Sequence, residues 1–239
     1  MKLDVLVIAV HPDDAELGCS GTLLKLKAEG KRTGIIDLTR GELGTRGTAE
    51  TRDAEAQDAA KVLQLDVREN LCMRDGFFLN NEEHQLRIIE KIRQYQPEIV
   101  ISNAIDDRHP DHGRAASLVN DAVFLSGLRK ISTELSGQKQ EAWRPRLLFH
   151  FVQSSYIKPD ILIDITPYWE GKLASIAAYK TQFYNPELQD EHQTFISTPD
   201  FARFVEARAR ELGKNIDAAY AEAFTCKKLL AVDSLFDLR

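Results

Sequence analysis

Cysteine is scarce in this chain of 239 residues. The three cysteines, Cys19, Cys72 and Cys226, are odd in number and widely spaced. This pattern fits neither a disulfide framework nor a zinc knuckle, so we expect reduced cysteines that pack as small apolar side chains. Cys19 is the exception to watch, because it follows His11 and Asp14 closely in the sequence. The cysteines therefore exclude a small disulfide scaffold and leave any chemistry to other side chains.

Long apolar runs and an excess of positive charge are also absent. The longest apolar run, residues 3–10, is far shorter than the ~20 residues of a membrane-spanning helix, and no charged segment of a signal peptide precedes it. The formal net charge of −6 disfavours nucleic acid as the main partner, because such binding rests on basic patches. We expect a cytoplasmic protein that acts on a small molecule.

No linker, repeat or low-complexity tract divides the chain, so we expect a single domain over residues 1–239. A chain of this length can bury roughly 70–75% of the surface that its unfolded form exposes, which allows one sizeable core. Its apolar content of 43% and charged content of 28% are typical of globular enzymes rather than disordered or membrane proteins.

Apolar strand patterns alternate with helical patterns along most of the chain. The predicted strands are residues 3–10, 33–39, 67–73, 98–103, 147–153 and 161–165, and the predicted helices are residues 15–29, 48–63, 82–95, 113–128, 168–182 and 199–212, before a short apolar end at 221–230. Strands separated by helices predict an α/β fold with a Rossmann-like, doubly wound, mostly parallel sheet flanked by helices.

This architecture predicts where a ligand binds. In doubly wound sheets the site lies beyond the carboxyl ends of the strands, where the winding reverses. If the strand order is 3-2-1-4, the loops after the first and fourth strands are neighbours, because adjacent strands lie only ~5 Å apart.

Histidine and aspartate are concentrated in these two loops, in HPDD at residues 11–14 and DDRHPDH at residues 106–112. Imidazole and carboxylate are ligand types that zinc takes, and a catalytic site leaves one position for water. His11, Asp14 and His112 would form such a site, with the proline of each motif keeping its stretch out of a helix so that the side chains converge. Each motif alone could instead be a helix cap or a solvated turn. Their predicted adjacency favours one metal site.

The other polar residues of the motifs suit hydrolysis. A bound zinc ion lowers the pKa of its water from roughly 15.7 to about 7. Asp13, next to a ligand, is placed to accept a proton as general base. His109, backed by Asp111, would stabilise a tetrahedral oxyanion or protonate a departing amine. The pattern predicts hydrolysis of an amide or ester.

The two motifs resemble those of the LmbE-like (PIG-L) N-acetylglucosaminyl deacetylases, which have an AHPDD-type motif and a later HPDH. Here the motifs are VHPDD at residues 10–14 and HPDH at residues 109–112, so only the alanine departs. The resemblance implies an LmbE-like fold, zinc on the three ligands named above, Asp13 as the base and His109 as the charged partner of the oxyanion.

Softer matches resemble the bacillithiol-biosynthesis branch of this family, which deacetylates N-acetylglucosaminyl malate. They are DLT at 37–39, GELGTRG at 41–47, Arg52, RDG at 74–76, DRHPDH at 107–112 and YAEAF at 220–224. Arginine suits bidentate recognition of malate carboxylates; Arg52 matches a substrate-binding arginine of the family, and Arg46 and Arg108 are further candidates. Alternatively, Arg52 is a solvated helical residue paired with Glu55. The resemblance also suggests a homo-oligomer such as a hexamer.

Some relatives assist the oxyanion with a C-terminal tyrosine, whose aligned position here is Phe201, with Tyr184 as a substitute. Three alternatives remain open. The same chemistry could act on another N-acetylglucosamine conjugate, or the protein could bind metal or sugar without catalysis, which the extra carboxylate of Asp13 disfavours. A nucleotide-binding protein is suggested only by GxxGxxG at residues 41–47, which follows the second strand rather than the first. Other divalent metals could also replace zinc.

Overall fold

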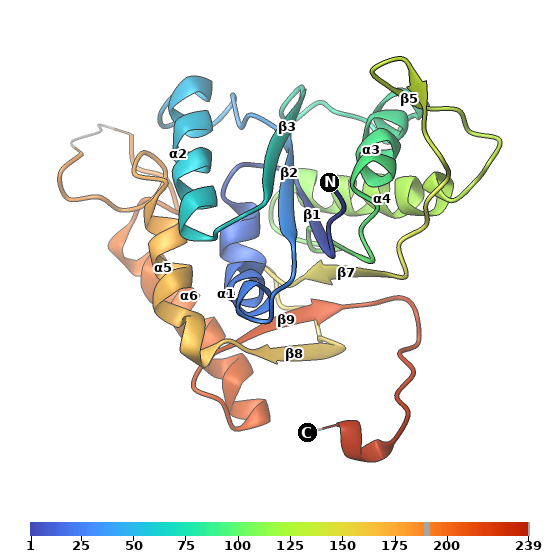
Figure 1. Ribbon diagram of the computed structural model, residues 1–239. Helices are drawn as coiled ribbons and strands as arrows, with labels where there is room; N and C mark the ends of the chain where they lie inside the picture. The colour runs from blue at the N-terminus through green and yellow to red at the C-terminus, as the bar shows by residue number, and fades with distance from the viewer. Residues whose placement is uncertain (189–191, 239) are drawn as a thin grey trace.

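The structure is a computed structural model that describes residues 1–188 and 192–238. A seven-stranded sheet forms its centre (Figure 1). The strands of this sheet are β1 (Val5–Ala9), β2 (Thr33–Thr39), β3 (Val67–Met73), β4 (Ile99–Ser102), β7 (Leu147–Phe151), β8 (Ile161–Asp164) and β9 (Ala221–Thr225), and a separate two-stranded hairpin contains β5 (Glu134–Leu135) and β6 (Gln138–Lys139).

The strand order is β3-β2-β1-β4-β7-β9-β8, and the five strands from β3 to β7 are parallel. The predicted α/β fold and the order 3-2-1-4 are therefore confirmed. β9 is antiparallel to both of its neighbours, β7 and β8. The sequence predicted only a short apolar end there, because its pairing depends on strands far away in the chain.

Helices cover both faces of the sheet (Figure 1). They are α1 (Asp14–Ala28), α2 (Ala49–Val62), α3 (Glu82–Tyr95), α4 (Pro110–Ser126), α5 (Trp169–Ala177) and α6 (Pro199–Gly213), with the short 3₁₀ helices η1 (Thr166–Tyr168), η2 (Lys214–Ile216) and η3 (Leu235–Asp237). Alternate residues of β1 pack on opposite sides: Leu6 and Ile8 in the core with α3 and α4, Val5 and Val7 in the core with α1. Both faces are buried, which explains the nearly continuous apolar sequence of this strand.

Two helices begin on the predicted metal motifs. α1 begins at Asp14 and α4 at Pro110, so Asp14 and His112 lie in first helical turns. The prediction that proline keeps both stretches out of helices is therefore wrong for Pro110. Proline is favoured at the first helical position, since its missing N–H would have no partner there and its φ fits the helix.

α5 is shorter than predicted and ends at Ala177 rather than at residue 182. The predicted continuation is replaced by a long-range contact: the backbone N–H and the hydroxyl of Thr181 both donate to the carboxylate of Glu55 in α2, at 2.7 and 2.9 Å. Nowhere in residues 1–188 and 192–238 is a helix both long and apolar enough to cross a membrane.

α1 is broken at Cys19, whose φ of −150° and ψ of 16° are not helical. The break frees backbone groups that two buried side chains satisfy. Lys172 of α5 donates to two carbonyls at 3.1 and 2.7 Å, and Glu222 of β9 accepts from two N–H groups at 3.0 and 2.7 Å. The carbonyls belong to Glu16 and Leu17, and the N–H groups to Gly21 and Thr22. Lys172 and Glu222 also pair with each other at 2.7 Å, so each charge complements the dipole of the helix end it contacts.

Candidate metal centre

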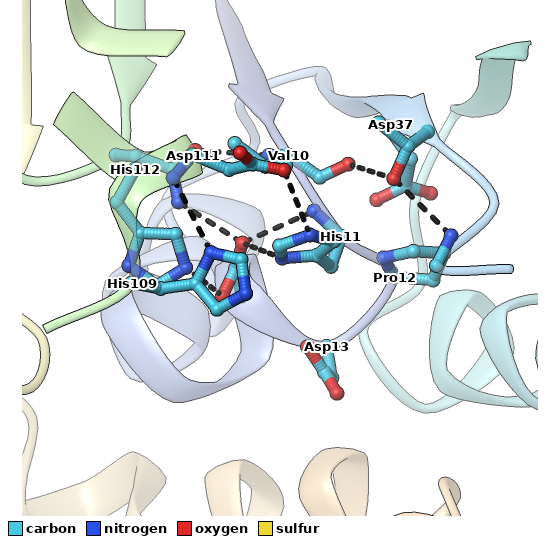
Figure 2. Close-up of polar contacts among 12 residues, drawn as sticks. Val10, His11, Pro12, Asp13, Asp37, His109, Asp111 and His112 are labelled. Carbon is cyan, nitrogen blue, oxygen red and sulfur yellow. Dashed lines mark hydrogen bonds and ion pairs between the residues drawn. The ribbon is translucent and has the colours of Figure 1, made fainter. Parts of the chain in front are cut away.

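The loops after β1 and β4 meet beyond the carboxyl ends of these paired strands, as the strand order predicts. Three imidazoles face one another there, those of His11, His109 and His112 (Figure 2). Their ring centroids lie 4.8 Å apart for His11 and His109, 5.3 Å for His109 and His112, and 5.8 Å for His11 and His112. All histidines of the two motifs therefore belong to one cluster.

Asp14 lies between two of these imidazoles. Its Oδ2 is 3.3 Å from Nδ1 of His11, and its Oδ1 is 3.2 Å from Nε2 of His112. Two amides hold the carboxylate: Asn103 donates to Oδ2 at 3.0 Å and Gln153 donates to Oδ1 at 2.8 Å. The three residues predicted as metal ligands are thus brought together by the fold.

A further carboxylate lies behind each of these two imidazoles. Nε2 of His11 is 2.9 Å from Asp75, and Nδ1 of His112 is 2.7 Å from Asp107. A carboxylate that accepts the N–H of one ring nitrogen fixes the tautomer and leaves the lone pair on the other nitrogen. Nδ1 of His11 and Nε2 of His112, the nitrogens next to Asp14, are therefore oriented as donors to a cation.

Sequence reasoning missed Asp75 and Asp107 as supports of the ligands. A signal was available, because Asp75 follows β3 and Asp107 follows β4, both at the edge of the sheet where the ligands lie. Among the described residues, the donor atoms of His11, His109 and His112, and those of His11, Asp75 and Asp111, lie close enough for one ion. A set of imidazoles and carboxylates with this support fits a divalent cation.

The electrostatics of the cluster link cation binding to pH. Burial acts to lower the pKa of His112, but the charge of Asp14 raises it to about 9. Burial opposes the charged form of His11 as well, yet hydrogen bonds to Asp111, Asp14 and Asp75 raise its pKa well above the usual value. These imidazole protons must leave before the nitrogens bind a cation, so metal affinity falls as the pH falls.

Asp13 lies on the other side of the HPDD loop and points away from the imidazoles (Figure 2). Its φ of 133° is rare for an aspartate, and such strain often accompanies functional sites. Its Oδ2 accepts a hydrogen bond from Arg52 at 2.7 Å, and the same guanidinium nitrogen donates to the carbonyl of Pro12 at 2.5 Å. Burial raises the pKa of Asp13 to about 7, although the charge of Arg52 lowers it. The carboxylate is therefore set to exchange a proton near neutral pH.

Arg52 is buried and does not pair with Glu55, whose carboxylate accepts hydrogen bonds from Thr181. The alternative reading of a solvated residue is therefore wrong. Arg52 contacts the predicted base, and its role towards a substrate carboxylate stays a prediction.

Asp111 is placed differently from the prediction. Its carboxylate accepts hydrogen bonds from the N–H of Gly76 at 2.9 Å and from Arg114 at 2.7 Å, and lies 3.7 Å from Nε2 of His11. Only its backbone N–H contacts His109, donating to Nδ1 at 3.3 Å. Residues two apart in a helical turn point to different sides, so this carboxylate supports His11 rather than His109.

A cavity of about 730 Å³ shares residues with the surroundings of the metal centre, although no histidine or aspartate of the two motifs is part of its wall. Gln153, which holds Asp14, is part of its wall, and so is Arg108, whose guanidinium lies 5.2 Å above the ring of Phe195. Phe201 also lines the cavity and stacks on Phe183 with ring centroids 5.8 Å apart.

Two other predicted residues lie outside this wall. Arg46 is buried, with its carbonyl accepting a hydrogen bond from Gln182 at 2.6 Å, and Tyr184 is half exposed; neither lines the cavity. Of the predicted residues near the substrate, the structure therefore brings Arg108 and Phe201 to the cavity.

Known proteins share both the fold and parts of the sequence. The family model of the GlcNAc-PI de-N-acetylases, PIG-L, matches residues 6–123. A conserved protein of Thermus thermophilus superposes with a TM-score of 0.84 at 37% identity, over 96% of this chain and 97% of that one. The diacetylchitobiose deacetylase of Thermococcus kodakarensis is 28% identical over 190 residues, 75% of this chain and 70% of the relative.

A third relative has a different activity. The 4-oxalmesaconate hydratase of Pseudomonas putida is 26% identical over 186 residues, 72% of this chain and 70% of the relative. Fold, metal-centre motifs and sequence matches agree in assigning the chain: it belongs to the PIG-L (LmbE-like) family.

Proposed function

We propose that this protein is a zinc-dependent deacetylase that removes the acetyl group from an N-acetylglucosamine conjugate, with N-acetyl-D-glucosaminyl L-malate as the substrate. The observation that supports catalysis most directly is the buried carboxylate of Asp13, which directly precedes Asp14 in the chain, is held by Arg52 at 2.7 Å and has its pKa raised by burial to about 7. A site that only stored a metal would not need this group.

His11, Asp14 and His112 would hold the metal, because Asp14 contacts the donor nitrogens of both histidines. When bound, zinc supplies a Lewis acid that activates water and polarises the acetyl carbonyl. Asp75 and Asp107 keep the two imidazoles in the orientation and tautomer that binding requires.

Asp13 then carries the proton. Its carboxylate accepts the proton of the attacking water as the new C–O bond forms, and releases it to the departing nitrogen as the C–N bond breaks, giving acetate and a free amine. Arg52 holds the carboxylate in place at 2.7 Å, and burial keeps the pKa near neutrality, so both transfers occur at neutral pH.

His109 is the candidate for stabilising the oxyanion. Its Nδ1 accepts the N–H of Asp111, which leaves the proton of a neutral imidazole on Nε2 as a donor. Burial and the charges of His11 and His112 lower its pKa below the usual value. We propose that this N–H donates to the oxyanion, and the charged form of His109 that the family resemblance implies stays a prediction.

The cavity beside the centre supports a conjugated substrate. Arg108 lines it and is suited to a carboxylate of the malate group, whereas Arg52 is already bonded to Asp13 and Arg46 lies outside the cavity wall. The deacetylase activity of the Thermococcus relative on an N-acetylated sugar supports the sugar part of the substrate.

The hydratase relative makes addition of water to an unsaturated acid the second candidate. Acetate release and metal content, measured together on the zinc-loaded protein, separate the two. We expect acetate from N-acetylglucosaminyl malate and no hydration of 4-oxalmesaconate. Hydration without acetate release would replace the proposal.

Two arginine variants test the substrate. Arg108→Ala should raise KM for the malate conjugate much more than for plain N-acetylglucosamine, because only the conjugate carries the carboxylates. Arg52→Ala should lower kcat for both substrates, because it acts through Asp13. Equal effects of Arg108→Ala on both substrates would remove its carboxylate role.

A further inference from the structure

A second hollow of the molecule is a groove between α4 and β7. Its volume is about 600 Å³, within the range of small-molecule sites. Parts of α4 and β7, the loop before β7 and the segment after β9 form its wall. None of its wall residues belongs to the metal centre or to the cavity that Arg108 lines. The groove is therefore separate from the proposed active site.

Positive charge is concentrated in this groove, although the whole chain has a formal net charge of −6. One acidic side chain, Asp121, is part of the wall, and it already accepts a hydrogen bond from Asn80 at 2.7 Å. In the part of the chain that the structure describes, none of the four basic side chains of the wall pairs with a carboxylate. A hollow lined by charges of one sign attracts ions of the other sign. The four basic residues are Arg144, Arg146, Lys227 and Lys228.

The buried imidazole of His150 is also part of the wall, with only 2% of the residue exposed. Its Nδ1 donates to the carbonyl of Asn103 at 2.8 Å, so the neutral ring has a lone pair on Nε2. The side chain of Asn103 is fixed in turn, because it accepts the N–H of Val10 at 2.9 Å and donates to Asp14 at 3.0 Å. Burial and the charge of Lys227 lower the pKa of His150, which keeps the ring neutral.

Nε2 of His150 has no hydrogen-bond partner among residues 1–188 and 192–238. Buried polar groups nearly always have a partner, so this nitrogen is an acceptor available to a donor in the groove. The imidazole is held in place by Asn103 and therefore needs no rearrangement to accept a hydrogen bond.

An apolar wall completes the groove. Phe124 is 58% exposed, and Arg144 is held beside it, with its guanidinium 4.5 Å above the ring and donating to the Phe124 carbonyl at 2.7 Å. Small-molecule sites usually combine such apolar walls with a few fixed polar groups. The other apolar side chains of the wall include Val123, Leu125 and Leu148.

We propose that this groove binds a small phosphate monoester with a hydroxylated carbon body, such as a sugar phosphate. A phosphate group carries about −1.5 to −2 charges at neutral pH, which matches four basic residues better than a single carboxylate does. The planar guanidinium groups of Arg144 and Arg146 suit its oxygens. A hydroxyl of the body would donate to Nε2 of His150, and its carbon atoms would pack on Phe124. The negative net charge of the chain disfavours a long polyanion such as nucleic acid.

Isothermal titration calorimetry on the zinc-loaded full-length protein tests the site with glucose 6-phosphate, glycerol 3-phosphate and glucose. We expect both phosphates to bind and glucose not to bind, and the tighter phosphate identifies the preferred carbon body. Arg146→Glu/Lys227→Glu should raise Kd about ten-fold or more, because two attractions become repulsions. The matched control is Lys61→Glu/Arg203→Glu, which changes the net charge equally on exposed positions of α2 and α6, away from α4 and β7 (Figure 1). Its Kd should stay close to that of the wild type.

His150→Asn separates a built site from a diffuse attraction between charges, because it removes the Nε2 acceptor without changing a Lys or Arg. We expect its Kd for glucose 6-phosphate to rise about three- to ten-fold, the value of one hydrogen bond. Circular dichroism should show that all variants fold.

Three results would overturn the proposal. They are a wild-type protein that binds neither phosphate, glucose that binds as tightly as the phosphates, and groove variants that bind as the wild type does, which would place the phosphate elsewhere, for example at the metal. An unchanged Kd in His150→Asn would overturn the assignment of this imidazole to the site. None of these results would affect the proposed deacetylase activity, because the groove contains none of the centre's residues.

Discussion

α1 carries two buried polar clusters, one at its start and one at its break, and they handle buried charge in different ways. At the break, the three protons of Lys172 meet three acceptors, and Glu222 accepts from this ammonium and two N–H groups. At the start, carboxylates converge on imidazoles that carry charge only when protonated. They are Asp14, Asp75, Asp107 and Asp111 around His11 and His112.

We interpret the cluster at the break as structural and the cluster at the start of α1 as a binding site, because their charges balance differently. A cluster in which each charge has an opposite charge and each donor an acceptor is complete in the folded chain. A cluster with an excess of carboxylates is stable only with added protons or a cation. The metal centre can therefore be recognised by its imbalance as well as by its ligand types.

The sharpest way to test the start of α1 is Asp13→Asn. We expect kcat for acetate release to fall by about 10²–10⁴, the usual contribution of a general base, with the zinc content unchanged because Asp13 contacts Arg52 rather than the imidazoles. Asp58→Asn, on the exposed side of α2, is the control and should remain active. A fully active Asp13→Asn protein would remove the assigned base.

Substitutions at the break of α1 should lower the free energy of unfolding. Lys172→Met leaves Glu222 buried without its counter-charge, and we expect a loss of about 3–5 kcal/mol in the free energy of unfolding by urea. The exchanged pair Lys172→Glu/Glu222→Lys keeps the ion pair but places each charge at the wrong helix end, so it should not restore stability. Full stability of the exchanged pair would show that the helix ends do not matter.

Replacing a carboxylate that supports a ligand should weaken zinc binding less than replacing the ligand itself. Asp107→Asn should weaken zinc affinity by about 10–100-fold, because the imidazole of His112 loses the acceptor that fixes its tautomer. The adjacent Asp106→Asn is the matched control, since this side chain is exposed. Competition with a fluorescent chelator measures both; equal affinities in the two variants would contradict the supporting role of Asp107.

The smallest effect is expected at His150, a buried histidine whose ring hydrogen-bonds to a backbone carbonyl rather than to a carboxylate. Its Nδ1 donates to the carbonyl of Asn103 at 2.8 Å, and burial lowers its pKa below the usual 6.5. The unfolded chain therefore binds more protons than the folded one just below pH 6.5, so this residue makes stability fall as the pH falls.

His150→Asn keeps an N–H donor but does not titrate. Its free energy of unfolding should depend less on pH between 7 and 5, with a difference in slope of at most about 1.4 kcal/mol per pH unit. Urea unfolding at several pH values measures the slope, and identical slopes for variant and wild type would show that His150 does not titrate differently in the folded state.

The sequence predicted the start of α1 much better than its break. Ligand types at the ends of two strands, together with strand order, were enough to bring His11, Asp14 and His112 together. The roles of Asp75 and Asp107 depend on where side chains point, and the helical start at Pro110 was misread because proline can begin a helix as well as prevent one.

The break of α1 was not predicted, because the side chains that satisfy it, Lys172 and Glu222, lie more than 150 residues further along the chain. A local trace exists in GCSG at residues 18–21. A Cβ on Gly18 would lie 2.4 Å from the ring of Phe151, and one on Gly21 would lie 2.8 Å from Ile165. Glycine at these positions lets α1 approach its neighbours, which sequence periodicity does not show.

The distribution of the ligands over two distant loops also has a consequence for how the chain folds. The two loops are separated by three helices and three strands, from α1 to β4, so the unfolded chain has no preformed site, and Asp14 and His112 meet only when β1 and β4 pair. A cation that binds only the paired state acts as a reversible cross-link between the two loops. At a concentration 100 times its dissociation constant it would add about 2.7 kcal/mol to the stability of the native chain, so thermal stability should report the occupancy of the centre.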